Sequence, residues 1–589
     1  MRWEKPEFNF VDRFWQASPE TTLDDTATHS SDRLHDSSGI VTLNGGALTV
    51  LGSSSATTEE VFNVLALGAG ASTVTLTPGS GQSAIVRLAG LPTNAAGAAS
   101  LWRGTNLGVN APGTANSANL LLTPTNANAF PLTGGGAPAG HPSISIIKGG
   151  FGDTSATGLG TQLVTYDFDK GIRLLNPATE YTTTLINGSI VTDNVKADGT
   201  ALALANPTFA NALWLSNGGS VTGAGTLNLT AGSLLVTGTG NTIANPIGAT
   251  TTLAVGGPGD VALNGAIGGG GGLTKLGAGT LTLGAANTFT GSIALTAGTV
   301  AIGNAAALPG TPAVRLLGGA IQNVTGSLLA LANNLTLNGP MLVSGAQDLT
   351  FTGTVSLANA THEINVTNTG TTTLGGVISS SQTLINYGLT KTGPGLLVLG
   401  NAANTYDGET TVAGGELRIS GSISASTLTT VQTGTLSGTG TVGNVSVLGG
   451  ATLQGGNDTA ATGALTSPGN ISLADNSIIK LTLGTGTTHS SLARTGGTWV
   501  FDSNQAFTFT LLGAGPATYD NVITGLLGTE AGLATVATWQ IATPGVAGTF
   551  SYDGSGGVDL VIATVPEPTT ASLLLLAGLG GLAARRRRR

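Results

Sequence analysis

Hydrophobic and polar residues alternate with a period of two along much of the chain, in short runs separated by glycine. Leucine alternates with threonine in 280–283, and isoleucine and leucine alternate with serine and alanine in 292–295. A half-buried strand has this period because its successive side chains point to opposite faces. Gly284 and Gly291 lie between the runs, where turns use positive φ angles. No part of the body keeps an apolar period of 3.6 residues, so the pattern predicts an all-β protein.

One stretch of this pattern occurs twice. Residues near 272–303 align with residues near 388–419, at an offset that starts at 116 positions and grows by one where the second copy has an inserted residue. Both copies read Gly-Leu-Thr-Lys, then Gly-x-Gly, a leucine-rich run, Ala-Ala-Asn-Thr and an aromatic residue. Strand and turn repeated at this scale favour a right-handed parallel β-helix, a solenoid with coils of about 20 residues stacked about 4.8 Å apart. A set of β-sandwiches is the alternative, but only 4% of residues are aromatic and could fill such cores.

Composition narrows the class of protein. The 589-residue chain has 93 glycines, 9% charged residues and no cysteine. With 40% apolar residues it does not resemble a disordered chain, and no disulfide can stabilise it. The net charge is -9 even with five terminal arginines included, so the acidic body would be repelled by nucleic acid. The scattered tryptophans are expected to fill or cap coils, and these are Trp102, Trp214, Trp499 and Trp539.

The repeated segments resemble the autotransporter-associated β-strand repeat, on the residues that both copies share. This resemblance implies a β-helical surface rod, which we expect to extend from residue 31 to residue 564, and it implies no particular activity. Residues 1–30 have no apolar core and no small-residue cleavage site of the kind that a secretory leader carries. We therefore expect this segment to be truncated or mis-started.

Residues 565–589 differ from the body. They consist of a short motif, an uncharged run over 571–584 and a basic cluster. The motif is Val565, Pro566, Glu567 and Pro568, and the basic cluster is Arg585, Arg586, Arg587, Arg588 and Arg589. The prolines keep the motif extended. The apolar run predicts a short C-terminal transmembrane helix, although it is shorter than the roughly 17 to 25 residues of a typical span. Arginines beside such a helix stay on the cytoplasmic side and act as a membrane stop.

This tail resembles the PEP-CTERM sorting signal of Gram-negative bacteria that make exopolysaccharide. The resemblance implies recognition by exosortase, a membrane-embedded transpeptidase that cleaves near Pro-Glu-Pro. Val565, Pro566, Glu567 and Pro568 would then form a processing motif and not a catalytic site. The protein is expected to be exported, tethered transiently to the inner membrane, and then placed at the cell surface or outside the cell.

Candidate chemistry elsewhere is sparse. The five histidines lack metal-ligand spacing and no cysteine could complete a thiolate site, so we predict no metal and no cofactor. Asp167 and Asp169 are expected to share one face of a strand, where paired carboxylates can bind Ca²⁺ or act on a glycosidic bond. A solvated strand face beside Lys170 and Arg173 is the reading that we favour. No catalytic residue is predicted.

These observations predict a non-enzymatic surface or extracellular-matrix protein with a structural or adhesin-like role. Its expected partners are exosortase, the membrane through the C-terminal helix before processing, and exopolysaccharide or other copies of the chain, with no nucleic acid. The alternative is a polysaccharide-degrading β-helix enzyme, either a lyase or a hydrolase. Such a site would gather Asp, Lys and Arg in one groove, and the sequence offers few candidates.

Overall fold

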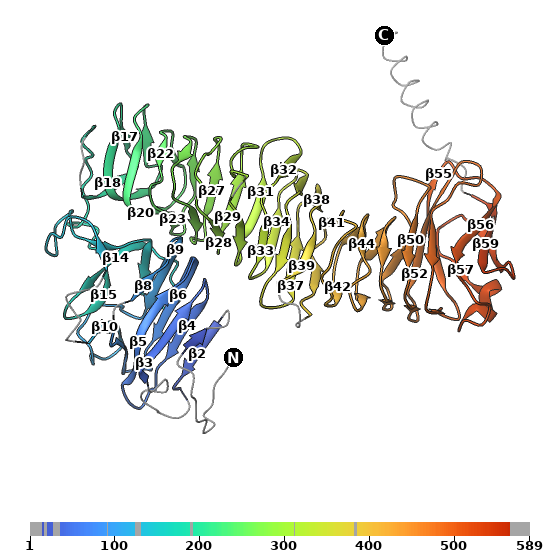
Figure 1. Ribbon diagram of the computed structural model, residues 1–589, viewed down its shortest axis with the longest axis horizontal. Helices are drawn as coiled ribbons and strands as arrows, with labels where there is room; N and C mark the ends of the chain where they lie inside the picture. Colours follow the sequence, from blue (N-terminus) through green and yellow to red (C-terminus); the bar gives the residue numbers. More distant parts are fainter. Residues whose placement is uncertain are drawn as a thin grey trace, which may run out of the picture. The chain divides into compact units, whose positions relative to one another are not determined.

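The structure, a computed structural model, describes residues 14–16, 20–26, 36–90, 92–123, 131–188, 192–310, 312–381 and 386–565. This part of the chain is nearly all β, and its one named helix, η2 (Leu533–Thr538), is a short 3-10 helix. Many strands are parallel and lie in long sheets, as a β-helical solenoid requires. The chain divides into two compact units, of which unit 1 is 1–356 with 367–370 and unit 2 is 357–366 with 371–589. Figure 1 shows the stacked strands of each.

Unit 1 begins with two sheets that enclose one core, here called the N-terminal coils. One sheet has β2 (Glu20–Asp24), β4 (Ala47–Leu51), β6 (Gly70–Thr77), β9 (Ala98–Gly104) and β13 (Gly150–Asp153) in parallel, followed by the antiparallel strands β14 (Gln162–Asp167) and β15 (Gly171–Leu174). The other sheet has β1 (Phe14–Gln16), β3 (Asp36–Leu43), β5 (Thr58–Leu67), β7 (Ser83–Leu88) and β10 (Ser117–Leu122). Side chains such as Leu48, Phe62 and Val74 pack between them and are at most 1% exposed. Strands β1 and β2 lie before residue 31, so the coils begin earlier in the chain than the expected boundary at that residue.

The rest of unit 1, here called the repeat coils, is a regular solenoid. One sheet, here called the covered sheet, contains β16 (Asn194–Asp198), β18 (Thr208–Ser216), β20 (Leu227–Thr237), β23 (Leu253–Gly256), β26 (Leu273–Lys275), β28 (Ile293–Leu295), β30 (Val314–Leu316) and β33 (Leu335–Leu337). A second sheet contains β21 (Asn241–Ile243), β24 (Val261–Leu263), β27 (Thr280–Leu283), β29 (Thr299–Ile302), β31 (Ala320–Asn323) and β34 (Met341–Ser344). Asn241 pairs with Val261, which pairs with Leu281, so one coil takes 20 residues as predicted.

The outer face of the covered sheet departs from the sequence expectation. Its central residues, which alternation assigns to the polar side, are buried: Ala254 and Thr274 are 1% exposed and Ala294 is 4% exposed. They stand in register on neighbouring strands. Their side chains are small, which lets other backbone approach closely. The N-terminal coils supply that backbone.

Three residues of this outer column hydrogen-bond to the N-terminal coils. Gly149 N–H donates to Ser233 Oγ at 3.0 Å, Thr274 Oγ1 donates to the Gly97 carbonyl at 3.0 Å, and Arg315 Nη1 donates to the Ala69 carbonyl at 2.5 Å. Later strands of the repeat coils therefore meet earlier loops of the N-terminal coils. Phe151, Trp214, Leu235 and Ala254 share one hydrophobic cluster beside them. The N-terminal coils therefore lie side-on against the repeat coils, with successive loops meeting successive strands.

Unit 2 is also built of stacked coils. Its first sheet contains β37 (His362–Val366), β40 (Leu389–Thr392), β42 (Thr410–Val412), β45 (Thr429–Val431), β48 (Val445–Val447), β51 (Ile471–Leu473) and β54 (Trp499–Val500). Its second sheet contains β38 (Thr371–Leu374), β41 (Leu396–Leu399), β43 (Glu416–Ile419), β46 (Thr435–Gly438), β49 (Thr452–Gln454), β52 (Ile478–Gly484), β55 (Ala506–Leu512) and β57 (Gln540–Ile541). Its third sheet contains β44 (Ser422–Ile423), β47 (Thr441–Val442), β50 (Ala464–Ser467) and β53 (Ser491–Arg494). Val412, Val431 and Val447 are in register and fully buried. Inward aliphatic columns of this kind form the core.

Unit 2 ends in a cap. The third sheet closes with β56 (Ala517–Thr524), β59 (Gly557–Thr564) and β58 (Ala547–Tyr552), which pair in antiparallel fashion. Aromatic side chains pack beside it, with Trp499 and Phe501 stacked at 5.1 Å between ring centroids and Phe501 lying 4.8 Å from Trp539. Trp499 and Trp539 are 1% and 5% exposed, so these tryptophans fill the last coils, as predicted.

Candidate functional segments: the repeat corners and the C-terminal strand

Lys275 and Lys391 occupy the same position in the two copies of the repeat, and both are buried. Each lies two residues after an inward leucine, so strand alternation turns the lysine inward as well. Their exposed fractions are 2% and 0%. Burying a charged ammonium group costs free energy unless the group is hydrogen-bonded. The partners of these lysines therefore decide whether the turn that follows each lysine strand, here called the repeat corner, is stable.

The partners of both lysines are backbone carbonyls of a turn. Lys391 Nζ donates to the carbonyl oxygens of Thr392, Gly393 and Gly414 at 2.8, 2.9 and 3.1 Å. Lys275 Nζ donates to the carbonyl oxygen of Gly277. Because Gly414 belongs to the following coil, the Lys391 ammonium ties together the corners of two coils.

Burial also changes the acidity of these lysines. Removal from water lowers the pKa of Lys275 to about 7, and the nearby Asp260 carboxylate partly opposes this change. The same cause lowers the pKa of Lys391 to about 8, with Glu416 opposing it. Near neutral pH each buried lysine therefore exchanges between a charged and a neutral form.

Two glycines make these corners sterically possible. Gly298 and Gly415, at matching positions of the two copies, have φ angles of +69° and +62°. A Cβ on Gly298 would lie less than 3 Å from the carbonyl oxygens of Gly277 and Gly279, and Gly415 has the same close approach to the turn before it. Glycine is therefore required by both conformation and space.

An asparagine of each copy bridges neighbouring coils. Asn287 accepts the N–H of Ile267 at 2.8 Å and donates to the carbonyl of Ala307 at 2.6 Å. Asn404 accepts the N–H of Ile378 at 2.8 Å and donates to the carbonyl of Ser422 at 2.9 Å. These side chains replace backbone hydrogen bonds where the chain turns between strands.

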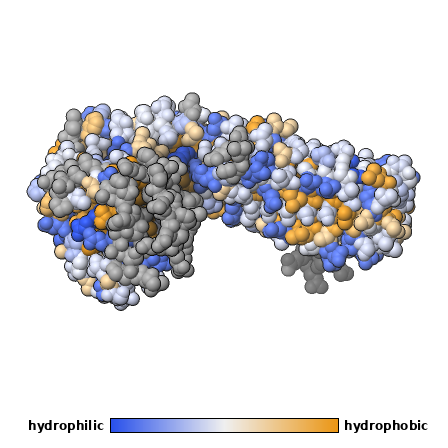
Figure 2. All heavy atoms as spheres, turned by 60° about the horizontal axis from the view of Figure 1, so that its bottom comes forward, coloured by the Kyte–Doolittle hydropathy of each residue, from blue (hydrophilic) through white to orange (hydrophobic). Residues whose placement is uncertain are grey.

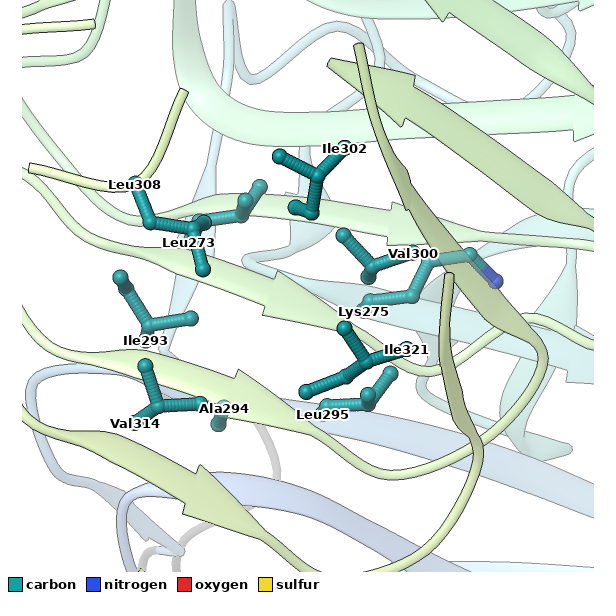
Figure 3. A pocket seen from close by; sticks show the side chains of 10 residues that line it. All are labelled: Leu273, Lys275, Ile293, Ala294, Leu295, Val300, Ile302, Leu308, Val314 and Ile321. Carbon is teal, nitrogen blue, oxygen red and sulfur yellow. The ribbon is translucent and has the colours of Figure 1, made fainter. Parts of the chain in front are cut away.

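The interior around Lys275 is packed and does not form a ligand cavity. Figure 3 shows Ile293 between Leu273 and Val314, with the amino group of Lys275 directed away from this aliphatic column. The void that these side chains line has a volume of about 10 Å³. Such a space holds at most about one water molecule. The repeat corner is thus a structural element of the solenoid wall.

Asp167 and Asp169 do not share a strand face. Strand β14 ends at Asp167, and Asp169 lies in the turn before β15, so this part of the sequence prediction was wrong. Asp167 Oδ1 accepts the N–H of Asp169 at 3.0 Å and of Lys170 at 3.1 Å, and its other oxygen lies 3.6 Å from Arg173 Nε. The carboxylate of Asp167 closes the hairpin turn.

Within the described residues, no group of three or more His, Cys, Asp or Glu side chains is placed to hold a metal ion. Buried ion pairs serve structural contacts instead. Arg173 donates to both carboxylate oxygens of Glu180 at 2.8 and 2.9 Å, and Glu180 also accepts the N–H groups of Gly140 and Asn176. This network fixes the connection between the N-terminal coils and the repeat coils.

The described chain reaches the start of the expected processing motif. Strand β59 ends at Thr564, which pairs with Ala547 of β58, and Val565 follows half-buried. Pro566, Glu567 and Pro568 lie outside the described residues, as do the apolar run and the membrane-stop arginines, Arg585, Arg586, Arg587, Arg588 and Arg589. Among the residues that are described, no helix has the length and hydrophobicity to cross a membrane.

Two family models match segments of the chain. The passenger-associated-transport-repeat model matches residues 273–302 and 389–419. The PEP-CTERM protein-sorting motif matches residues 564–589. The chain carries both. No curated protein matches it.

These matches confirm the resemblances seen in the sequence. The two copies of the passenger repeat coincide closely with the predicted repeat, and they are the segments that place Lys275 and Lys391 in the corners. The PEP-CTERM motif supports export and sorting to the cell surface or the extracellular space, and it implies processing by exosortase. Neither match assigns or excludes an enzymatic activity.

Sequence reasoning missed the two buried lysines. The available signal was their spacing, because Lys275 and Lys391 each stand two positions after a leucine in a strand whose alternation faces inward. It also missed the outer contact of Thr274, since the partner carbonyl belongs to Gly97. No local pattern contains that information.

Proposed function

We propose that the chain is an exported surface or extracellular-matrix protein with a structural or adhesin-like role, sorted by exosortase. The observation that carries this proposal is the PEP-CTERM match over residues 564–589, which begins at the last residue of the terminal strand β59. The folded coils would be the part of the chain that is exported. The tail would be the signal that directs their sorting.

In this proposal the tail acts in two steps. The apolar run 571–584 and the five arginines, Arg585 to Arg589, hold the chain transiently at the inner membrane with the coils on the far side. Exosortase then processes the motif, Val565 to Pro568, and frees or re-attaches the body. The body, whose first strands precede the boundary expected at residue 31 and which extends to residue 564, would consist of right-handed coils.

Several features of the coils support a structural role. Their interior is a continuous set of aliphatic columns, and their corners are tied by buried lysine and asparagine side chains. In Figure 2, hydrophobic residues gather on one face of unit 2. The exposed large hydrophobic residues of that unit include Leu448, Val500 and Leu527. Exposed apolar surface of this kind often serves contacts with other molecules. We propose exopolysaccharide or further copies of the chain as partners.

Sorting is tested by substitution of the motif. Replacing Pro566, Glu567 and Pro568 with alanine should leave the tail uncleaved and keep the chain in the membrane fraction of an exosortase-bearing host. The matched control replaces Thr569 and Thr570 with alanine, which changes neighbouring residues and leaves the motif intact. Unchanged processing of the motif variant would refute the sorting role.

Adhesion is tested with the processed chain and a panel of neutral and acidic polysaccharides. Retention on a polysaccharide without shortening of that polymer supports the adhesin-like role. Shortening of the polymer supports the alternative, a lyase or hydrolase. Absence of both would leave a purely structural role, and light scattering would then report association between copies.

A further inference from the structure

The strand that precedes the sorting motif is hydrogen-bonded almost to the motif itself. β59 is the middle strand of the cap, and Ile562 pairs with Ala517 of β56 on one side and with Gly548 of β58 on the other. After a register shift that skips Ala563, Thr564 pairs with Ala547 of β58. The motif match begins at this same residue, so folded cap and sorting signal overlap by one position.

This overlap creates a conflict for any enzyme that processes the motif. One recurring way for a protein to bind an extended peptide is to hydrogen-bond to its backbone as an added strand. A backbone N–H or C=O that is already paired within a sheet is not free for a second strand partner. Only Val565 lies between Thr564 and Pro566, which gives at most about 7 Å of chain from the last paired residue to the first proline of the motif.

The side chains at the end of β59 indicate how far the strand can open. The side chains of Ala563 and Thr564 are already exposed, so releasing Thr564 from β58 buries or uncovers neither of them. Ile562 is 2% exposed and belongs to the core of the cap. Peeling therefore stops at Ile562, where further opening would expose that core to water.

We propose that the exit of β59 gates processing: the sorting enzyme engages the motif only after Thr564 has separated from Ala547 of β58. This inference rests on the proposed sorting function. Its consequence is that the rate of processing follows the opening of the strand end at Thr564, while the remainder of the cap stays folded.

A cross-link across the exit tests the gate. The chain has no cysteine, so Ala547→Cys with Thr564→Cys introduces a single disulfide between directly paired residues. Paired residues of antiparallel strands have Cα separations of about 4.5 to 5.5 Å, which a disulfide can bridge. The control, Thr549→Cys with Val561→Cys, cross-links the same two strands upstream of Ile562 and leaves the exit free.

Each full-length variant is incubated with membranes that contain exosortase, with and without reductant, and loss of the tail is followed by mass. We expect the oxidised exit variant to be processed an order of magnitude more slowly than its reduced form, and the oxidised control to match the unmodified chain. Inserting a six-residue Gly-Ser linker between Thr564 and Val565 should restore processing of the oxidised exit variant.

The outcomes separate the two proposals. If the unmodified chain is not processed, the sorting function itself fails. If the unmodified chain is processed and the oxidised exit variant keeps pace with it, the gate is overturned. The gate is equally overturned if the control cross-link slows processing as much as the exit cross-link, or if the linker fails to restore processing.

Discussion

The hydroxyl of Thr274 donates a hydrogen bond to the carbonyl oxygen of Gly97, 177 residues earlier in the sequence, at 3.0 Å. Thr274 stands on the outer face of a strand, where a solenoid normally meets water, yet it is 1% exposed. Gly97 has φ +83° and presents a loop without a side chain to that face. This contact lies at the centre of the column that joins the N-terminal coils to the repeat coils.

Replacing Thr274 with valine should destabilise this junction. The change keeps the shape of the side chain and removes the donor to the Gly97 carbonyl, which corresponds to about 1 to 2 kcal/mol for a buried acceptor. Thr390→Val is the matched control, because Thr390 has the same place in the second repeat and is half-exposed. Hydrogen exchange should accelerate in residues 69–99 for the first variant only. Equal exchange in the two variants would contradict the assigned contact.

Replacing Gly298 with alanine should destabilise the first repeat by more than its backbone angle alone explains. The left-handed conformation costs a non-glycine residue about 1 to 2 kcal/mol, and the close carbonyl oxygens add a steric cost. Gly326→Ala has positive φ in open space, and Gly310→Ala has neither feature. Denaturation midpoints should therefore fall most for Gly298, less for Gly326 and least for Gly310. A midpoint for Gly298→Ala equal to that for Gly326→Ala would remove the steric argument.

The buried lysines predict that stability rises with pH. Their pKa values in the folded chain, about 7 for Lys275 and about 8 for Lys391, lie below the roughly 10.4 of an unfolded lysine. Between these values the unfolded chain binds more protons, so the free energy of unfolding increases with pH, by up to about 1.4 kcal/mol per pH unit for each lysine. Unfolding by denaturant from pH 6 to pH 10 should show this rise.

The lysine origin of that rise is checked by substitution. Lys275→Met and Lys391→Met should each reduce the slope of unfolding free energy against pH. The pKa of the buried Tyr406, raised to about 12 by burial, affects stability only at the alkaline end, where unfolded tyrosine ionises first. Slopes that stay the same in both variants would show that other groups cause the pH dependence.

Replacing Asn287 with leucine should be costly because two buried backbone groups lose their partner. The N–H of Ile267 and the carbonyl of Ala307 would both be unpaired, which corresponds to about 2 to 5 kcal/mol in total. Asn444 makes the same kind of bridge at an exposed corner, accepting from Asn470 and donating to Thr427. Asn444→Leu should cost less than about 1 kcal/mol, because water replaces the lost bonds there. Similar losses in thermal stability would argue against the role of burial.

Much of the fold could be predicted from the sequence because its cause is local. Alternation placed Leu281 and Leu283 inward, and the structure confirms that both are fully buried in β27. The coil length of about 20 residues is confirmed by register. The turn at Asp169 could not be predicted in this way, since Asp167 ends its strand by hydrogen-bonding to the backbone that follows, and a period of two does not record where pairing stops.

For the candidate processing segment too, one part could be predicted from the sequence and another part could not. The sorting motif is a linear signal, so Pro566, Glu567 and Pro568 could be recognised from the sequence, and the family match confirms the motif. The pairing of Thr564 with Ala547 could not, because it depends on how the cap closes. The sequence names the processing segment, and only the folded cap shows that the strand before it is paired up to Thr564.

The sequence by itself determined the β character, the repeat, the coil length and the sorting tail, because each depends on residues that are close together along the chain. Tertiary structure alone decided that Thr274 and Ala294 are covered and that Lys391 reaches the Gly414 carbonyl of the following coil. Burial of an outer face depends on which distant backbone reaches it. For this chain that backbone is the loop at Gly97, brought to the column by packing between coils and not by any local pattern.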